Sequence, residues 1–186
     1  MSTTQRNISD SFYYPVFFTG VLWIIHLIQS VFNLSFIRLG ILPRNKDGLI
    51  GIFTAPLIHK NFFHLLSNSI PLLISGFLIF LFYRKQAWAV IAFVYIMTGV
   101  CVWLFANSDA YHIGASGLIY GLLSYLFFNG IFRRDFKSVI IAVIILIFYG
   151  GIFWGIFPNQ PGISWQSHLF GTLAGALASY NFKKKH

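Results

Sequence analysis

The run Ser138–Phe157, SVIIAVIILIFYGGIFWGIF, contains no charged residue and is long enough to cross a lipid bilayer as a helix. A spanning helix needs about 20 mostly apolar residues. The rest of the chain has the same character, since 57% of its 186 residues are hydrophobic and only 9% are charged. Soluble domains carry about 25% charged residues. The composition therefore excludes a soluble domain and predicts an all-α membrane protein.

Further apolar runs of similar length lie on both sides of this one. The six predicted spans are residues 16–36, 63–83, 87–106, 114–132, 138–157 and 164–182. Together they predict one membrane domain over residues 1–186, with a single long connection at about residues 37–62. The apolar segment Leu49–Ile58 of that connection is too short to span, so we expect it to lie in the interface or to dip partly into the membrane.

Positive charge predicts the orientation of these spans, because cytoplasmic loops are enriched in Lys and Arg. Six spans put both termini on one side. With a cytoplasmic N-terminus, the inner segments hold Arg6, Arg84, Lys85, Arg133, Arg134, Lys137, Lys183, Lys184 and Lys185. The outer segments hold Arg38, Arg44, Lys46 and Lys60. We therefore predict cytoplasmic termini in a cell membrane, and we assign the net charge of +9 to contact with lipid, not nucleic acid.

Polar residues inside spans are costly and are candidates for function. His64 and Asn68 lie four residues apart, on one face of the second span. Ser116 opens the fourth span and His168 lies about one turn into the sixth. Because all three spans enter from the outer side, these four residues are predicted to meet at a similar depth, near the outer face.

Small residues predict how the fourth and sixth spans pack. Gly117 and Gly121 form one G-x-x-x-G pattern, and Gly171 and Gly175 form another. Such faces let helix backbones approach closely in lipid. Packing through them would bring Ser116 and His168 together, with Tyr120 one turn below the serine.

These residue types permit acyl transfer. A serine hydroxyl becomes a nucleophile when a base takes its proton, and His168 can do so for Ser116. The His64 ring, the Asn68 amide and the Ser116 backbone N–H are suitable donors to an oxyanion. No carboxylate lies within a span, so a Ser–His pair is predicted. Asp109 is an alternative third member, although a solvated loop acid explains it better.

Other interpretations apply to the same residues. Ser116 could be a small packing residue, and His64, Asn68 or His168 could bridge helices by hydrogen bonds. Zinc bound by His59, His64 and His168 is disfavoured, because the chain has no Glu and no H-E-x-x-H, and its one cysteine, Cys101, excludes a Cys-based site. We predict no metal and no cofactor. His26 and His112 are interpreted as structural or solvated.

Three segments resemble the motifs of the rhomboid intramembrane serine proteases, in the family's order and on the corresponding spans. They are His59–Asn68 (HKNFFHLLSN), Gly114–Gly117 (GASG) with Tyr120, and Ser164–Gly171 (SWQSHLFG) followed by Gly175. The resemblance implies a six-helix rhomboid-like bundle with Ser116 as nucleophile and His168 as general base. It also implies His64 and Asn68 as oxyanion-hole side chains and a stacking role for Tyr120. His59, Gly114, Gly117, Gly171 and Gly175 would be supporting residues.

The resemblance further implies a wet cavity open to the extracytoplasmic face and substrates that are transmembrane segments of other proteins. The fifth span and the loop Pro158–Gln166 would act as gate and cap. One departure is that many members carry Trp-Arg in the first outer loop, where this chain has Leu42-Pro43-Arg44. The alternative functions are a proteolytically silent rhomboid-like binder of membrane proteins and a small transporter, although no internal repeat favours the latter.

Overall fold

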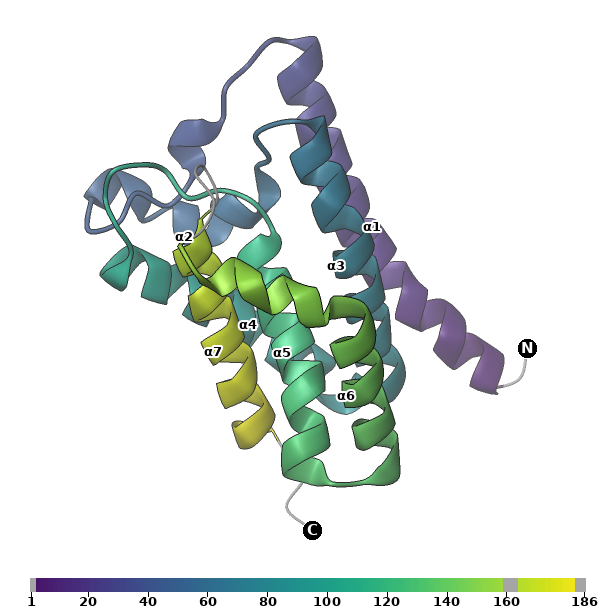
Figure 1. Cartoon of the computed structure of the whole chain (residues 1–186). Helices are drawn as coiled ribbons and strands as arrows, with labels where there is room; N and C mark the ends of the chain where they lie inside the picture. The colour runs from purple at the N-terminus through teal and green to yellow at the C-terminus, as the bar shows by residue number, and fades with distance from the viewer. Residues whose placement is uncertain (1–2, 159–163, 183–186) are drawn as a thin grey trace.

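The computed structural model describes residues 3–158 and 164–182, and over these residues the fold is all-α, without a β-strand (Figure 1). The α-helices are α1 (Thr3–Val31), α2 (Gly51–Thr54), α3 (Phe62–Phe82), α4 (Arg84–Phe105), α5 (Ser116–Arg133), α6 (Phe136–Tyr149) and α7 (Trp165–Asn181). Short 3₁₀ helices are η1 (Ile37–Leu39), η2 (Lys46–Gly48), η3 (Ala55–Leu57) and η4 (Gly150–Ile156).

Helix α5 is the centre of the bundle, with α3, α4, α6 and α7 packed around it. Most of its residues are buried, including Tyr125, which is fully buried. Helices α5 and α7 meet through their small residues, as the G-x-x-x-G spacing predicts. A Cβ on Gly171 would collide with the Gly117 carbonyl, and a Cβ on Gly175 with the Gly121 carbonyl. Because the backbones are this close, residues at the starts of the two helices can reach one another.

Helix α1 packs mainly on α3 and extends away from the rest of the bundle toward the N-terminus (Figure 1). It begins at Thr3, earlier in the chain than the predicted start of the first span at residue 16, and it ends at Val31. The helix residues before Val16 mix polar and apolar side chains, and one of them, Phe12, stacks on Phe77 of α3 with ring centroids 4.0 Å apart. Asp10 also pairs with Arg84 at 2.7 Å. This part of α1 therefore contacts both α3 and the start of α4.

The predicted fifth span, residues 138–157, is not one continuous α-helix. Helix α6 ends at Tyr149, and the chain continues as the 3₁₀ helix η4. The pair Gly150-Gly151 lies at this boundary, and glycine disfavours a continuing α-helix. An α-helix of 14 residues is about 21 Å long, shorter than a hydrocarbon core of about 30 Å. The η4 segment instead lies across α5 and α7 (Figure 1).

The long outer connection contains η1, η2, α2 and η3, and it is held against the end of α4. The Arg44 guanidinium donates to the carbonyls of Ala106 and Leu104, at 2.6 and 3.3 Å. The indole of Trp103 donates to the Asn45 carbonyl at 2.9 Å. Thus an arginine of the connection and a tryptophan of α4 anchor this segment, although the connection itself has no Trp-Arg pair.

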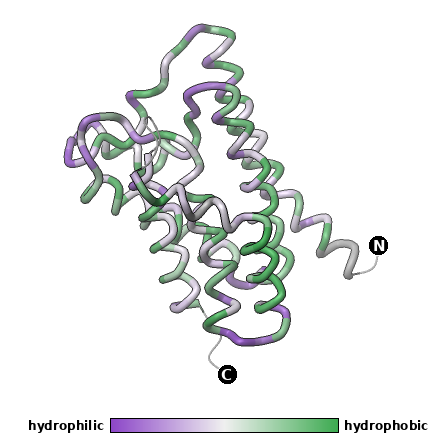
Figure 2. Tube along the Cα trace, in the orientation of Figure 1, coloured by the Kyte–Doolittle hydropathy of each residue, from purple (hydrophilic) through white to green (hydrophobic). Residues whose placement is uncertain are grey.

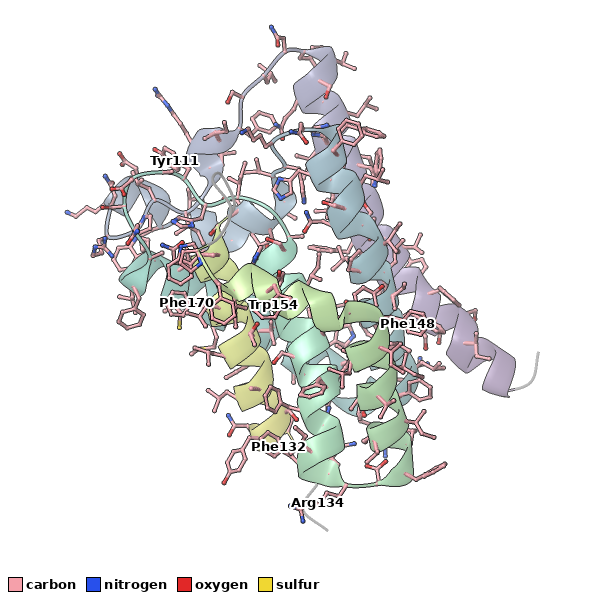
Figure 3. All side chains as sticks on the ribbon, viewed as in Figure 1. Tyr111, Phe132, Arg134, Phe148, Trp154 and Phe170 are labelled. Carbon is pink, nitrogen blue, oxygen red and sulfur yellow. The ribbon has the colours of Figure 1, made fainter. Side chains whose placement is uncertain are left out.

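The helices Ile8–Val31, Phe62–Phe82 and Arg84–Phe105 are long and apolar enough to cross a membrane. Figure 2 shows apolar colour along these helices and along α6, with polar colour at the turn between α5 and α6. Large apolar side chains point outward, among them Phe63, Phe136 and Phe148, the last labelled in Figure 3. The chain is therefore a helical membrane protein, and its six-span count stays a prediction.

Candidate active site

The candidate nucleophile is Ser116, the first residue of α5. The turn before it depends on Gly114, whose φ of +108° is a conformation that L side chains rarely adopt. Two hydrogen bonds fix this turn to the outer connection. The Gly114 N–H donates to the Ala55 carbonyl at 2.9 Å, and the Ala115 N–H donates to Nε2 of His59 at 3.4 Å. The hydroxyl of Ser116 is thereby held at the start of a helix.

Ser116 and His168 are brought together, as the packing of α5 on α7 predicts. Nε2 of His168 lies 2.9 Å from Oγ of Ser116. Nδ1 of the same ring lies 3.0 Å from the Gly155 carbonyl of η4. A carbonyl can only accept, so the proton of the neutral ring is on Nδ1 and Nε2 accepts from the serine hydroxyl. This is the tautomer that a general base requires.

Tyr120 supports the imidazole from α5. Its ring stacks on that of His168, with centroids 4.0 Å apart and planes 7° apart. Gly155 lies against the same pair, and a Cβ at this position would collide with the Tyr120 hydroxyl. Three segments, α5, η4 and α7, therefore fix the orientation of one histidine ring.

His64 of α3 faces the turn before Ser116. A Cβ built on Gly114 would lie 2.8 Å from Nε2 of His64. The Lys60 N–H approaches Nδ1 of His64 at 3.5 Å, which favours a proton on Nε2, the nitrogen that faces the turn. Asn68 is buried on the same helix face, and its amide nitrogen donates to the His64 carbonyl at 2.6 Å.

His59 is fully buried beside His64, with ring centroids 5.1 Å apart. Burial, with a smaller contribution from His64, lowers the pKa of His59 to about 3. The ring is therefore neutral at pH 7, which leaves its Nε2 free to accept from Ala115. Among the residues that the structure describes, no group of three or more His, Cys, Asp or Glu side chains could hold a metal ion.

Sequence reasoning did not identify every residue of the site. The group that contacts Nδ1 of His168 is the Gly155 carbonyl, a backbone group that no sequence motif identifies. Asp109, which the sequence offered as an alternative third member, is exposed. His112, interpreted from the sequence as structural or solvated, is buried and contacts Ser164 beside the start of α7. Trp154 of η4 is 70% exposed and is labelled in Figure 3. Residues 159–163 of the predicted cap loop lie outside the described residues.

Comparison with known proteins adds an independent observation. The family model described as "Rhomboid domain" matches residues 46–185. A protein of Mycobacterium bovis and one of Mycobacterium tuberculosis are each 40% identical over 172 residues, covering 88% of this chain and 71% of the relative. A Mycobacterium leprae protein is 39% identical over 172 residues, covering 88% of this chain and 68% of the relative. All three relatives are described as uncharacterized proteins.

Proposed function

Since the chain belongs to the rhomboid family, we propose that it is an intramembrane serine endopeptidase with Ser116 as nucleophile and His168 as general base. One observation supports this most strongly: Oγ of Ser116 lies 2.9 Å from a histidine nitrogen whose partner nitrogen is held by the Gly155 carbonyl. A packing serine would have no need of an oriented, unprotonated imidazole nitrogen.

The proposed reaction begins when Oγ of Ser116 attacks the carbonyl carbon of a peptide bond while its proton passes to Nε2 of His168. The tetrahedral intermediate collapses with cleavage of the C–N bond, and the imidazolium gives its proton to the leaving amine. A water then attacks the acyl-enzyme, losing a proton to His168, and that proton returns to Oγ as the acid is released. The Gly155 carbonyl and the Tyr120 ring hold the imidazole in place throughout.

The oxyanion would be stabilised by groups around the turn at Gly114. The backbone N–H of Ser116 lies at a helix start, where donors are free and the dipole favours negative charge. His64 presents Nε2 toward the same turn. The Asn68 amide has one proton engaged by the His64 carbonyl and a second proton available to the oxyanion. Each such donor contributes about 10²–10³-fold in kcat in serine proteases.

The substrates would be transmembrane segments of other proteins, consistent with a site assembled at helix ends within a membrane protein. The proposed topology has six spans, cytoplasmic termini and a site open to the extracytoplasmic face. The charge asymmetry and the placement of Ser116 and His168 at the starts of their helices support it. The η4 segment, which contacts His168 and Tyr120 through Gly155, would form part of the gate to the site.

A fluorophosphonate probe on the purified full chain tests the activity. We expect covalent labelling of the wild type and none of Ser116→Ala, with the thermal unfolding midpoint of the two proteins alike. Cleavage of a fluorogenic transmembrane peptide should disappear in the same variant. Equal labelling of both proteins would exclude Ser116 as nucleophile. A wild type that neither labels nor cleaves would favour a silent binder of membrane proteins.

A further inference from the structure

The turn that carries Ser116 is tied to the outer connection, and the His112 side chain links the same turn to the start of α7. The His112 backbone pairs with Ile41, with N–H to carbonyl distances of 2.8 and 3.0 Å. Together with the bonds from Gly114 and Ala115, this anchors three residues of the turn to the outer connection. None of these bonds has a partner in α7, the helix that carries the base.

The His112 side chain reaches the start of α7. Its Nδ1 lies 2.5 Å from Oγ of Ser164, and Nε2 lies 3.1 Å from the Asn107 carbonyl. The carbonyl can only accept, so Nε2 carries the proton and Nδ1 accepts from the Ser164 hydroxyl. The ring is 8% exposed, and burial lowers the pKa of His112, which favours this neutral form.

Ser164 in turn organises the first turn of α7. It is the N-cap of this helix, and its oxygen accepts from the Ser167 N–H at 3.3 Å. The hydroxyls of Ser164 and Ser167 lie 2.6 Å apart. Since the Ser164 proton is donated to His112, the Ser167 hydroxyl is the donor to Ser164. The next residue is His168, whose N–H donates to the Ser164 carbonyl.

We infer that His112 is a positioning residue, which sets the distance between nucleophile and base through the chain His112–Ser164–Ser167. The inference rests on the proposed function, because it concerns the alignment of Ser116 with His168. His112 precedes Ser116 by four positions, and Ser164 precedes His168 by four positions. The chain of hydrogen bonds thus joins the two segments close to both reacting groups. A displacement of about 1 Å at a reacting pair can cost about 10²-fold in rate.

His112→Phe and His112→Gln separate this role from simple packing. Phenylalanine fills the space and leaves the backbone bonds to Ile41 intact, but it cannot accept from Ser164. We expect kcat and the rate of fluorophosphonate labelling to fall about tenfold or more, with KM unchanged. Glutamine can accept from Ser164 and donate to the Asn107 carbonyl, so it should restore most of the rate. Ser164→Ala should match His112→Phe, and the double variant should be no slower than either.

Asp135→Ala is the matched control for Ser164→Ala. Asp135 is the N-cap of α6, a helix that carries no proposed site residue, and it accepts from the Ser138 N–H at 3.0 Å. Both cap losses should lower the unfolding midpoint, but only Ser164→Ala should slow labelling. A labelling rate in His112→Phe equal to that of the wild type would overturn the positioning role. Equal decreases in labelling rate in His112→Phe and His112→Gln would overturn it as well.

Amide hydrogen exchange gives a readout that does not need proteolytic activity. His112→Phe should speed exchange in the first turn of α7 about fivefold, the equivalent of one hydrogen bond. His112→Gln should leave it unchanged. Unaltered exchange in His112→Phe would contradict the inference even if the wild type proved inactive. A wild type that fails to label, with faster exchange in His112→Phe, would instead contradict only the proposed function.

Discussion

At the scale of single residues, the site depends on histidines held neutral by their surroundings. His59 accepts the Ala115 N–H next to the nucleophile and is fully buried. His168 donates to a backbone carbonyl and accepts from Ser116. In both cases one ring nitrogen must stay unprotonated for the hydrogen bond to exist. Acid therefore acts on the scaffold of the site as well as on the base.

The lowered pKa of His59 predicts a loss of stability in acid. The pKa is about 3 in the fold and 6.5 in the unfolded chain. Between these pH values the unfolded state binds more protons than the folded state. The contribution of His59 to the free energy of unfolding is therefore complete above about pH 6.5 and decreases as the pH falls, by at most about 1.4 kcal/mol per pH unit. Unfolding midpoints from pH 7.5 to 4 should fall less steeply in His59→Gln, whose amide can still accept from Ala115. Parallel curves for the two proteins would contradict the assignment to His59.

At the scale of elements, η4 is the segment that orients the base, and Gly155 is the residue that lets it approach. A Cβ on Gly155 would collide with the Tyr120 hydroxyl and lie 3.2 Å from Nδ1 of His168. Gly155→Ala should therefore displace η4, remove its carbonyl from the imidazole and slow fluorophosphonate labelling about tenfold or more. Gly151→Ala is the control in the same 3₁₀ helix, because nothing lies within 4 Å of its Cβ position. Equal labelling rates in the two variants would show that η4 does not orient His168.

The sequence predicted the site residues and the helix packing that follow from polar residues in apolar runs and from regularly spaced glycines. Polar side chains in apolar runs indicated Ser116, His168, His64 and Asn68, because such residues are costly unless they have partners. Periodic glycines predicted the packing of α5 on α7. The break after α6 was visible as Gly150-Gly151 but was included in an apolar span, since hydropathy does not distinguish α from 3₁₀ helix.

Other contacts of the site and the fold have no sequence pattern that would predict them. The Gly155 carbonyl belongs to the backbone, and any residue supplies one. His112 and Ser164 lie far apart in sequence and meet only through the tertiary fold. Asp10 of α1 and Arg84 of α4 also lie far apart in sequence and pair only in the fold. In each case the structure is decided by contacts between distant segments, which apolarity and local spacing do not report.

At the scale of the whole molecule, the arrangement of the ends bears on the topology. In Figure 1 the outer connection, residues 32–61, lies at one end of the bundle and the α5–α6 turn at the opposite end. Helices α3 and α4 are each long and apolar enough to cross a membrane. Helix α5 carries glycine, serine, tyrosine and asparagine, and most of it is buried against other helices. Its neighbours, not its own apolar surface, would shield it from lipid.

Cysteine accessibility tests whether α5 crosses. In a Cys101→Ser background, single cysteines replace three exposed residues: Lys46 in the outer connection, Lys85 at the start of α4, and Arg134 after α5. An impermeant maleimide should label Lys46→Cys in intact cells, and Lys85→Cys and Arg134→Cys only after permeabilisation. Lys85 lies at the start of α4 and Arg134 lies just after α5. If α4 crosses outward and α5 crosses back, both residues lie on the cytoplasmic side. If α4 crosses and α5 does not, Arg134 lies on the outer side. Labelling of Arg134→Cys in intact cells would therefore contradict the six-span topology while leaving the Ser116–His168 pair untouched.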